Sequence, residues 1–158
     1  MGRRNFREML EAKWAEGKFV CVGLDSEVAK MNQDFALFQS HPQFSYNRAI
    51  VDATKDVVCA YKPNAAFYEA EGDNGLNALF DTVRYIQKTA PDVPIILDAK
   101  RGDIDNSNAA YVTAAFDSLG ADAITVHPYL GAEAMKSFLD YKEKGIIAEE
   151  IRMYQDMP

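Results

Sequence analysis

Short apolar runs alternate with longer stretches whose apolar residues recur every three or four positions. The short runs predict buried strands, and the longer stretches predict amphipathic helices; Phe6, Leu10 and Trp14, for example, share one helical face. The segments predicted as strands, two of them with the loop that follows, are FVCVGLD (19–25), YKPNAAFY (61–68), VPIILDA (93–99) and ADAITVHPYL (121–130). The segments predicted as helices are residues 5–16, 45–60, 76–90, 104–119 and 131–145.

Local signals indicate where several helices begin and end. Ser45 is a candidate N-cap, and Gly120 stands where a helix C-terminal cap belongs. Residues 26–44 lack a clear period and contain Pro42 as a breaker, so they predict a loop with one helical turn.

The predicted order, an N-terminal helix and then four strand–helix units, defines an α/β fold. Strands that are apolar on both faces indicate a parallel sheet covered by helices. This alternation fits either a doubly wound sheet or a (β/α)₈ barrel, and periodicity does not choose between them. The 158 residues predict a single domain without an internal linker.

Composition narrows the classes of function. The formal net charge of -7 argues against general nucleic-acid binding, which needs a surplus of Lys and Arg. No apolar run approaches the roughly 18 residues that a membrane span needs, and the N-terminus does not resemble a signal peptide. Cys21 and Cys59 lie in apolar runs and predict two buried thiols in a reducing compartment. We therefore expect a cytoplasmic protein.

Polar residues follow the predicted strands at their carboxyl ends, where ligands bind in α/β folds. Asp25 ends the first strand, Lys62 lies in the second, DAKRGD (98–103) follows the third, and His127 follows the fourth. We expect these side chains to meet at one rim.

DAKRGD is the densest of these clusters. In an extended chain, Asp98 and Lys100 point to the same face. A lysine beside carboxylates stays protonated and can act as a placed proton donor. The alternative is a solvated turn with ordinary ion pairs, and the pattern alone leaves both open.

Four segments of the chain resemble orotidine 5′-monophosphate decarboxylases of the bacterial-type branch. The spacing Asp-x-Lys-x-x-Asp in LDAKRGDI is shared with related phosphosugar decarboxylases, but its context is more specific. The matching segments, in the family's order, are FVCVGLDS, YKPNAAFYE, DAKRGDIDNSNAAY and ADAITVHPYLG. The resemblance covers about residues 4–146 and implies the first half of a (β/α)₈ barrel.

The resemblance implies an array of charged catalytic residues. Lys100 matches the lysine that protonates C6 of the pyrimidine as CO₂ leaves, and Asp98 matches the carboxylate beside the departing group. Lys62 and Asp103 match the other members of a Lys-Asp-Lys-Asp array. In the family the last aspartate reaches the neighbouring subunit's site, which implies a homodimer with shared active sites.

Substrate-binding residues are implied in the same way. Asp25 matches a ribose-hydroxyl contact that Lys62 shares, and Ser107 stands where many relatives have Thr. His127 is expected at the rim, in packing or outer hydrogen bonding, and Arg101 is left unassigned. The family uses neither cofactor nor metal, so the expected ligand is a nucleotide alone.

The resemblance ends near Gly145. A (β/α)₈ barrel takes about 250 residues, and the family's phosphate-gripping arginine has no counterpart here. We therefore expect residues 147–158 to be a divergent tail of a truncated, frameshifted or split chain.

Three functions remain open. The first is decarboxylation of orotidine 5′-monophosphate to UMP in de novo pyrimidine biosynthesis, impaired by truncation. The second is a related Mg²⁺-dependent phosphosugar lyase, against which the YKPN and DAKRGDI contexts argue. The third is a non-catalytic half-barrel that serves as an assembly module.

Overall fold

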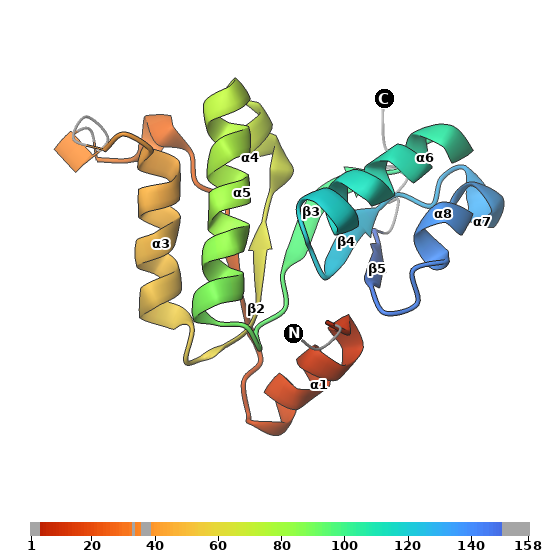
Figure 1. The fold of residues 1–158 in the computed structure, drawn as a ribbon, viewed down its shortest axis with the longest axis horizontal. Helices are drawn as coiled ribbons and strands as arrows, with labels where there is room; N and C mark the ends of the chain where they lie inside the picture. The colour runs from red at the N-terminus through yellow and green to blue at the C-terminus, as the bar shows by residue number, and fades with distance from the viewer. Residues whose placement is uncertain (1–3, 33, 36–38, 150–158) are drawn as a thin grey trace, which may run out of the picture.

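The computed structural model describes residues 4–32, 34–35 and 39–149, and strands and helices alternate along them (Figure 1). The strands are β1 (Val20–Leu24), β2 (Val58–Pro63), β3 (Ile96–Arg101), β4 (Ala123–Val126) and β5 (Gly145–Ala148). The helices are α1 (Phe6–Ala15), α3 (Pro42–Thr54), α4 (Ala65–Glu69), α5 (Gly72–Thr89), α6 (Asp105–Val112), α7 (Gly131–Ala134) and α8 (Lys136–Leu139). Two shorter turns complete them, the 3₁₀ turn η1 (Val28–Lys30) and the π-helical turn η2 (Thr113–Ser118).

The strands are parallel and lie beside one another in chain order. β1 pairs with β2, β3 pairs with β4, and β4 pairs with β5. Two isolated parallel bridges, Tyr61 to Ile95 and Asn64 to Asp98, link β2 to β3. A doubly wound sheet reverses its strand order at a switch point, whereas a (β/α)₈ barrel keeps chain order. The fold is therefore a partial (β/α)₈ barrel, and the predicted fold class is confirmed.

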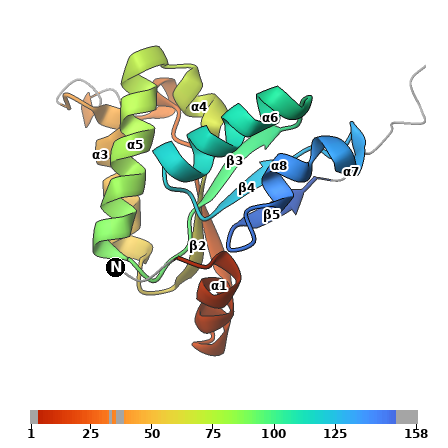
Figure 2. The same cartoon turned by 45° about the vertical axis from the view of Figure 1, so that its right-hand side comes forward.

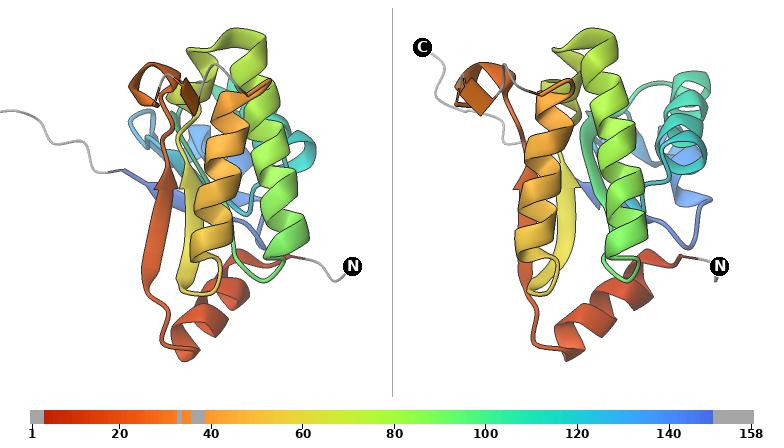
Figure 3. Two further views of the ribbon diagram at one scale, coloured as in Figure 1. Left: turned by 90° about the vertical axis from the view of Figure 1, so that its left-hand side faces the viewer. Right: turned by 60° about the vertical axis from the view of Figure 1, so that its left-hand side comes forward.

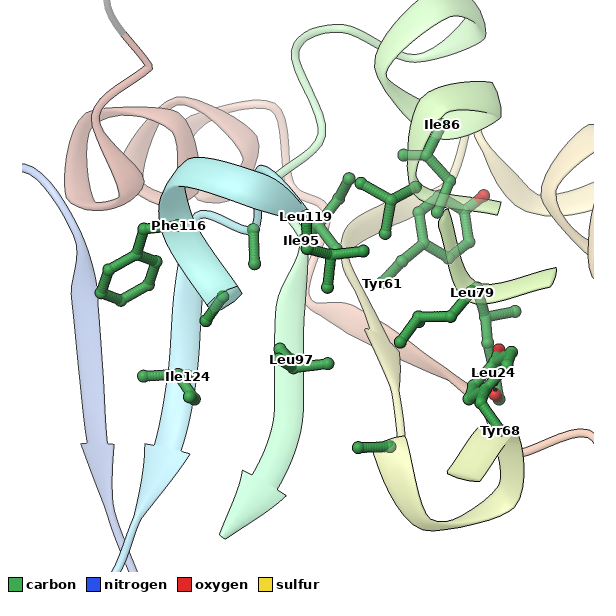
Figure 4. Close-up of a cluster of buried hydrophobic side chains, with 14 of the residues drawn as sticks. Leu24, Tyr61, Tyr68, Leu79, Ile86, Ile95, Leu97, Phe116, Leu119 and Ile124 are labelled. Atoms are coloured by element: carbon green, nitrogen blue, oxygen red, sulfur yellow. Dashed lines mark hydrogen bonds between the residues drawn. The ribbon is translucent and has the colours of Figure 1, made fainter. Parts of the chain in front are cut away.

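The main core lies between the strands and the helices on the outer face (Figures 2 and 4). Leu97 of β3 and Ile95, which immediately precedes the strand, point into this core. Residues of α5 and of the α6–η2 segment belong to the same core. Its largest fully buried members are Tyr61, Tyr68, Phe138, Ile86, Ile95, Ile124, Val51, Val58, Val83, Val93 and Val126. Because strand residues alternate between faces, Ile96 and Asp98 point to the opposite, inner face.

The inner face has its own apolar layer at the amino ends of the strands. Helix α1 lies beneath these ends (Figures 1 and 3). Phe6 and Leu10 of α1 pack there against a small cluster of strand residues. Arg4, just before α1, forms a salt bridge of 2.6 Å with the buried Asp122. The lower end of the half-barrel is therefore closed, and the polar inner residues lie above this layer.

Three segments differ from the prediction. Residues 58–60, expected at the end of a helix, begin β2, because Val58, Cys59 and Ala60 are all buried in the sheet. Residues 65–69, expected in a loop, form α4, whose N-cap Asn64 accepts a hydrogen bond from Ala66 N. The expected helix over residues 131–145 is instead two single turns, α7 and α8, and residue 145 already belongs to β5.

Some residue-level predictions were also wrong. Helix α3 begins at Pro42, which occupies the first turn where its missing N–H costs nothing, rather than after Ser45. Trp14, expected on the apolar face of the first helix, is 45% exposed. Cys59 is buried as predicted, whereas Cys21, which was also predicted to be buried, is exposed. Gly120 does have a left-handed φ of 82° just after the helical segment ends, as expected of a C-terminal cap. No helix in the described residues is both long enough and apolar enough to cross a membrane.

Gly75 allows α5 to pack tightly against α4, and its replacement is the first test. A Cβ at this position would lie 1.9 Å from the backbone oxygen of Tyr68, which no rotamer change relieves. We expect Gly75→Ala to lower the free energy of unfolding by at least about 2 kcal/mol, despite the higher helix propensity of alanine. Urea unfolding measures this. The exposed neighbour Asn77→Ala is the control, and equal stability of the two variants would contradict the packing.

Candidate active site

A buried carboxylate lies between two lysines at the carboxyl ends of β2 and β3. Lys62 Nζ is 2.6 Å from Asp98 Oδ2, and Lys100 Nζ is 2.5 Å from Asp98 Oδ1. The sequence predicted all three residues for this site, and the structure brings them together on the inner face. The alternative of a solvated turn is wrong for Asp98, whose side chain is only 7% exposed.

Asp98 is held in its ionised form. Burial alone would raise the pKa of its carboxyl, but hydrogen bonds from Lys100, Lys62 and Thr125 outweigh burial and lower the pKa to about 2. At neutral pH the site therefore contains a fixed negative charge held between the side chains of two lysines.

Lys100 lies where β3 departs from regular strand geometry. The register between β3 and β4 shifts between Leu97 and Arg101, and Lys100 has a φ of 49°. A positive φ is costly for a residue with a side chain and is concentrated at functional sites. The hydrogen bond with Asp98 raises the pKa of Lys100, and Glu149, 3.2 Å away, acts in the same direction. Its side chain is 45% exposed, so the charged ammonium is accessible from the rim.

Two residues at this site were missed by sequence reasoning. The hydroxyl of Thr125 donates to Asp98 Oδ1 at 2.9 Å and accepts from two backbone N–H groups of β3. Glu149 follows β5 and pairs with Lys100. Residues two apart in a strand share a face. Ala123 and Ile147 lie on the inner face, so this alternation is the signal that would have placed Thr125 and Glu149 there as well.

Asp103 is held apart from this cluster, in the loop after β3. Its carboxylate accepts a hydrogen bond from Ile104 N at 2.7 Å, and in the described part of the chain no ion pair joins it to Lys100. Buried Asn108 fixes the loop by accepting from Asp103 N and donating to Asp103 O. Gly102 is required because a Cβ would lie 2.4 Å from the backbone oxygen of His127.

The other predicted substrate-binding residues, Asp25 and Ser107, lie at the same rim but outside the lysine–aspartate cluster. Asp25 directly follows β1 and lines a hollow with Ser26, Lys30 and Tyr46. Ser107 is half-buried in the first turn of α6. Their expected roles stay predictions.

The remaining candidates are peripheral. His127 follows β4, is 40% exposed and lies 4.0 Å from Glu149, so it is at the rim as expected. Arg101 pairs with Glu69 and lies over the ring of Tyr111, which gives it a structural partner on the outer face. Within the described ranges, no three His, Cys, Asp or Glu side chains gather in a way that could hold a metal ion.

The fold and site together define a (β/α)-barrel protein with a charged site at the carboxyl ends of its strands. A profile of the family described as orotidine 5′-phosphate decarboxylase / HUMPS matches residues 18–150. The chain belongs to this family. The match includes β5, and the expected divergent tail over residues 147–158 stays a prediction; residues 150–158 lie outside the described residues.

Proteins with similar sequences and structures bear the name of this family. Orotidine 5′-phosphate decarboxylases of Parabacteroides distasonis and Bacteroides fragilis strain YCH46 are 44% and 46% identical over 143 residues, which are 90% of this chain. The solved OMP decarboxylase of Leishmania donovani is 33% identical with a TM-score of 0.77, over 91% of this chain and 52% of that one. The chain spans about half the length of the curated relatives it matches.

The low pKa of Asp98 predicts a specific loss of stability in acid. Because the pKa falls from the usual 3.8 to about 2 on folding, the stabilisation is present above about pH 4 and is lost as the pH falls toward 2. It amounts to about 2 kcal/mol. Urea unfolding between pH 5 and 2.5 should show this loss in the wild type and not in Asp98→Asn.

Asp81, whose side chain is 46% exposed and lies 3.7 Å from Arg84, supplies the matched control, and Asp81→Asn should retain the wild-type pH dependence. Direct ¹³C titration of the Asp98 carboxyl should give a midpoint near the same low value. A midpoint close to 4 would contradict the proposed hydrogen bonding.

Proposed function

We propose that this chain carries the proton-donating part of an orotidine 5′-phosphate decarboxylase, which converts orotidine 5′-phosphate to UMP and CO₂. The observation that carries the proposal is the Lys62–Asp98–Lys100 cluster, with one buried carboxylate between two ammonium groups at the strand ends. Family membership and the names of the relatives support the same reaction. The proposed reaction is a step of de novo pyrimidine biosynthesis, and we expect it to take place in the cytoplasm.

The reaction needs a positive charge fixed near C6. When the C6–carboxylate bond breaks, its electron pair stays on C6 as a carbanion with little resonance stabilisation. A preorganised ammonium stabilises that charge without reorganising at the moment of reaction. In the proposed mechanism Lys100 supplies this charge and then transfers its proton to C6, which completes UMP. The raised pKa of Lys100 keeps it protonated until then.

Asp98 has two roles in this proposal. Its carboxylate holds both lysines by hydrogen bonds of 2.5–2.6 Å, which fixes the direction of the ammonium groups. It also lies beside the departing carboxylate, where repulsion between like charges is relieved as CO₂ leaves. Lys62 balances the second oxygen of Asp98 and shares the ribose hydroxyls with Asp25, while Ser107 also binds the substrate.

Asp103 is proposed to act in the site of a second copy of the chain. Two observations support a homodimer with shared sites. The Asp103 loop lies at the rim, and its carboxylate has no ionic partner among the described residues of its own chain. Beside it, Ile104 and Leu130 line one hollow and are 64% and 50% exposed, so an apolar surface is available for the partner.

We further propose that residues 1–158 form part of one barrel domain rather than an independent module. Among the described residues, the outermost strands β1 and β5 each pair with one strand, β2 and β4 respectively. Unpaired strand edges favour association with further strands. The functional test therefore supplies the half of the barrel that the relatives have in addition, by fusing the second half of the Bacteroides fragilis protein to this chain.

The fusion should form UMP from orotidine 5′-phosphate, followed by absorbance. Lys100→Ala should reduce kcat at least about a thousandfold, because it removes the charge and the proton donor together. Lys88→Ala, an exposed lysine of α5, should retain wild-type activity and is the control. A Lys100→Ala fusion with more than a few per cent of the wild-type kcat would overturn the assignment. EDTA should have no effect; loss of turnover in EDTA would indicate a metal-dependent lyase instead.

A further inference from the structure

Thr125 bonds to three successive residues of the neighbouring strand. It lies on the inner face of β4 and is 4% exposed. Its hydroxyl accepts hydrogen bonds from Ala99 N at 3.0 Å and Lys100 N at 2.9 Å, and it lies 2.9 Å from Asp98 Oδ1. A single side chain therefore contacts every residue of the segment that carries the central charges.

The valence of the hydroxyl fixes the direction of its proton. A threonine hydroxyl has one donor and two acceptor sites. The two backbone N–H groups occupy both acceptor sites, so the proton has to point toward Asp98. An ionised carboxylate accepts this bond, and it also accepts hydrogen bonds from Lys62 and Lys100. The three bonds therefore orient Asp98 and favour its charged form.

The same hydroxyl compensates for the irregularity of β3. The left-handed backbone of Lys100, with φ 49°, is costly relative to an ordinary strand conformation. In a regular strand, successive N–H groups point to opposite neighbours, so only one of Ala99 N and Lys100 N could bond to a carbonyl of β4. The register shift removes that regular pairing, and both N–H groups are turned toward Thr125 instead. Thr125 replaces the missing acceptors, and buried N–H groups are expensive to leave without one.

We propose that Thr125 is the positioning residue of this site, and that its hydroxyl holds the bend at Lys100 and the orientation of Asp98 at the same time. The catalytic consequence rests on the proposed decarboxylation: Thr125 touches no substrate and acts by placing the Lys100 ammonium. Its structural consequence does not depend on any reaction.

The test compares Thr125→Val, which has nearly the same shape without the hydroxyl, with Thr125→Ser, which keeps the hydroxyl. In Thr125→Val we expect hydrogen exchange at Ala99 N and Lys100 N to be about tenfold faster, since each loses its acceptor. The ¹³C titration midpoint of Asp98 should rise by about half a unit or more, because one bond to its charged form is gone. Thr125→Ser should restore both readouts, and exchange at Ile86 N in α5 should not change.

The proposal is overturned if Thr125→Val keeps the wild-type exchange rates at Ala99 N and Lys100 N or the wild-type titration midpoint of Asp98. It is also overturned if Thr125→Ser behaves like Thr125→Val. If Thr125→Val does not fold, the unmutated chain decides: a Thr125 hydroxyl proton held toward Asp98 should be protected and visible by NMR, and a freely exchanging one overturns the proposal.

In the fused barrel, Thr125→Val should lower kcat at least about tenfold with little change in KM, and Thr125→Ser should recover it. An inactive wild-type fusion would count against the proposed function alone, because exchange and titration require no turnover.

Discussion

The site depends on keeping one carboxylate ionised inside the protein. Burying an unpaired charge costs far more than a domain of this size can spare, so Asp98 needs positive partners and hydrogen bonds. Lys62 and Lys100 supply the charges from β2 and β3, and Thr125 adds a bond from β4. Three neighbouring strands are therefore tied together at their carboxyl ends, which is also where the proposed chemistry takes place.

The side chains of β3 and of the residue before it alternate between the helix-covered core and the inner face, so this segment connects the fold to the site. Ile95 and Leu97 point outward into the helix-covered core, and Ile96 and Asp98 point inward. A shift of one residue would exchange these faces and bury the charge among the helices. The irregularity begins only after Leu97, so the part of the strand that anchors the core stays regular while Lys100 takes a conformation suited to the site.

Much of this arrangement could be predicted from the sequence, and the failures have physical causes. Apolar runs located three of the strands well, and charge after the third run identified Asp98 and Lys100. Residues 58–60 were assigned to a helix because a short apolar run fits a buried strand or a helix equally. Thr125 was missed because the alternation along β4 places it on the inner face but does not reveal the irregularity in β3 that gives it its role. Glu149 was missed because the polar residues after Ile147 hid the short strand β5.

The most direct test of the account is whether Asp98 controls the charge of Lys100. Replacement of Asp98 by Asn keeps the size of the side chain and removes its charge. The account predicts that the ¹³Cε titration midpoint of Lys100 is lower in Asp98→Asn than in the wild type, because the pKa of Lys100 is raised chiefly by its bond to Asp98. Lys136, whose pKa is raised by Asp140, should titrate unchanged in both. An identical Lys100 midpoint in the two proteins would contradict the account.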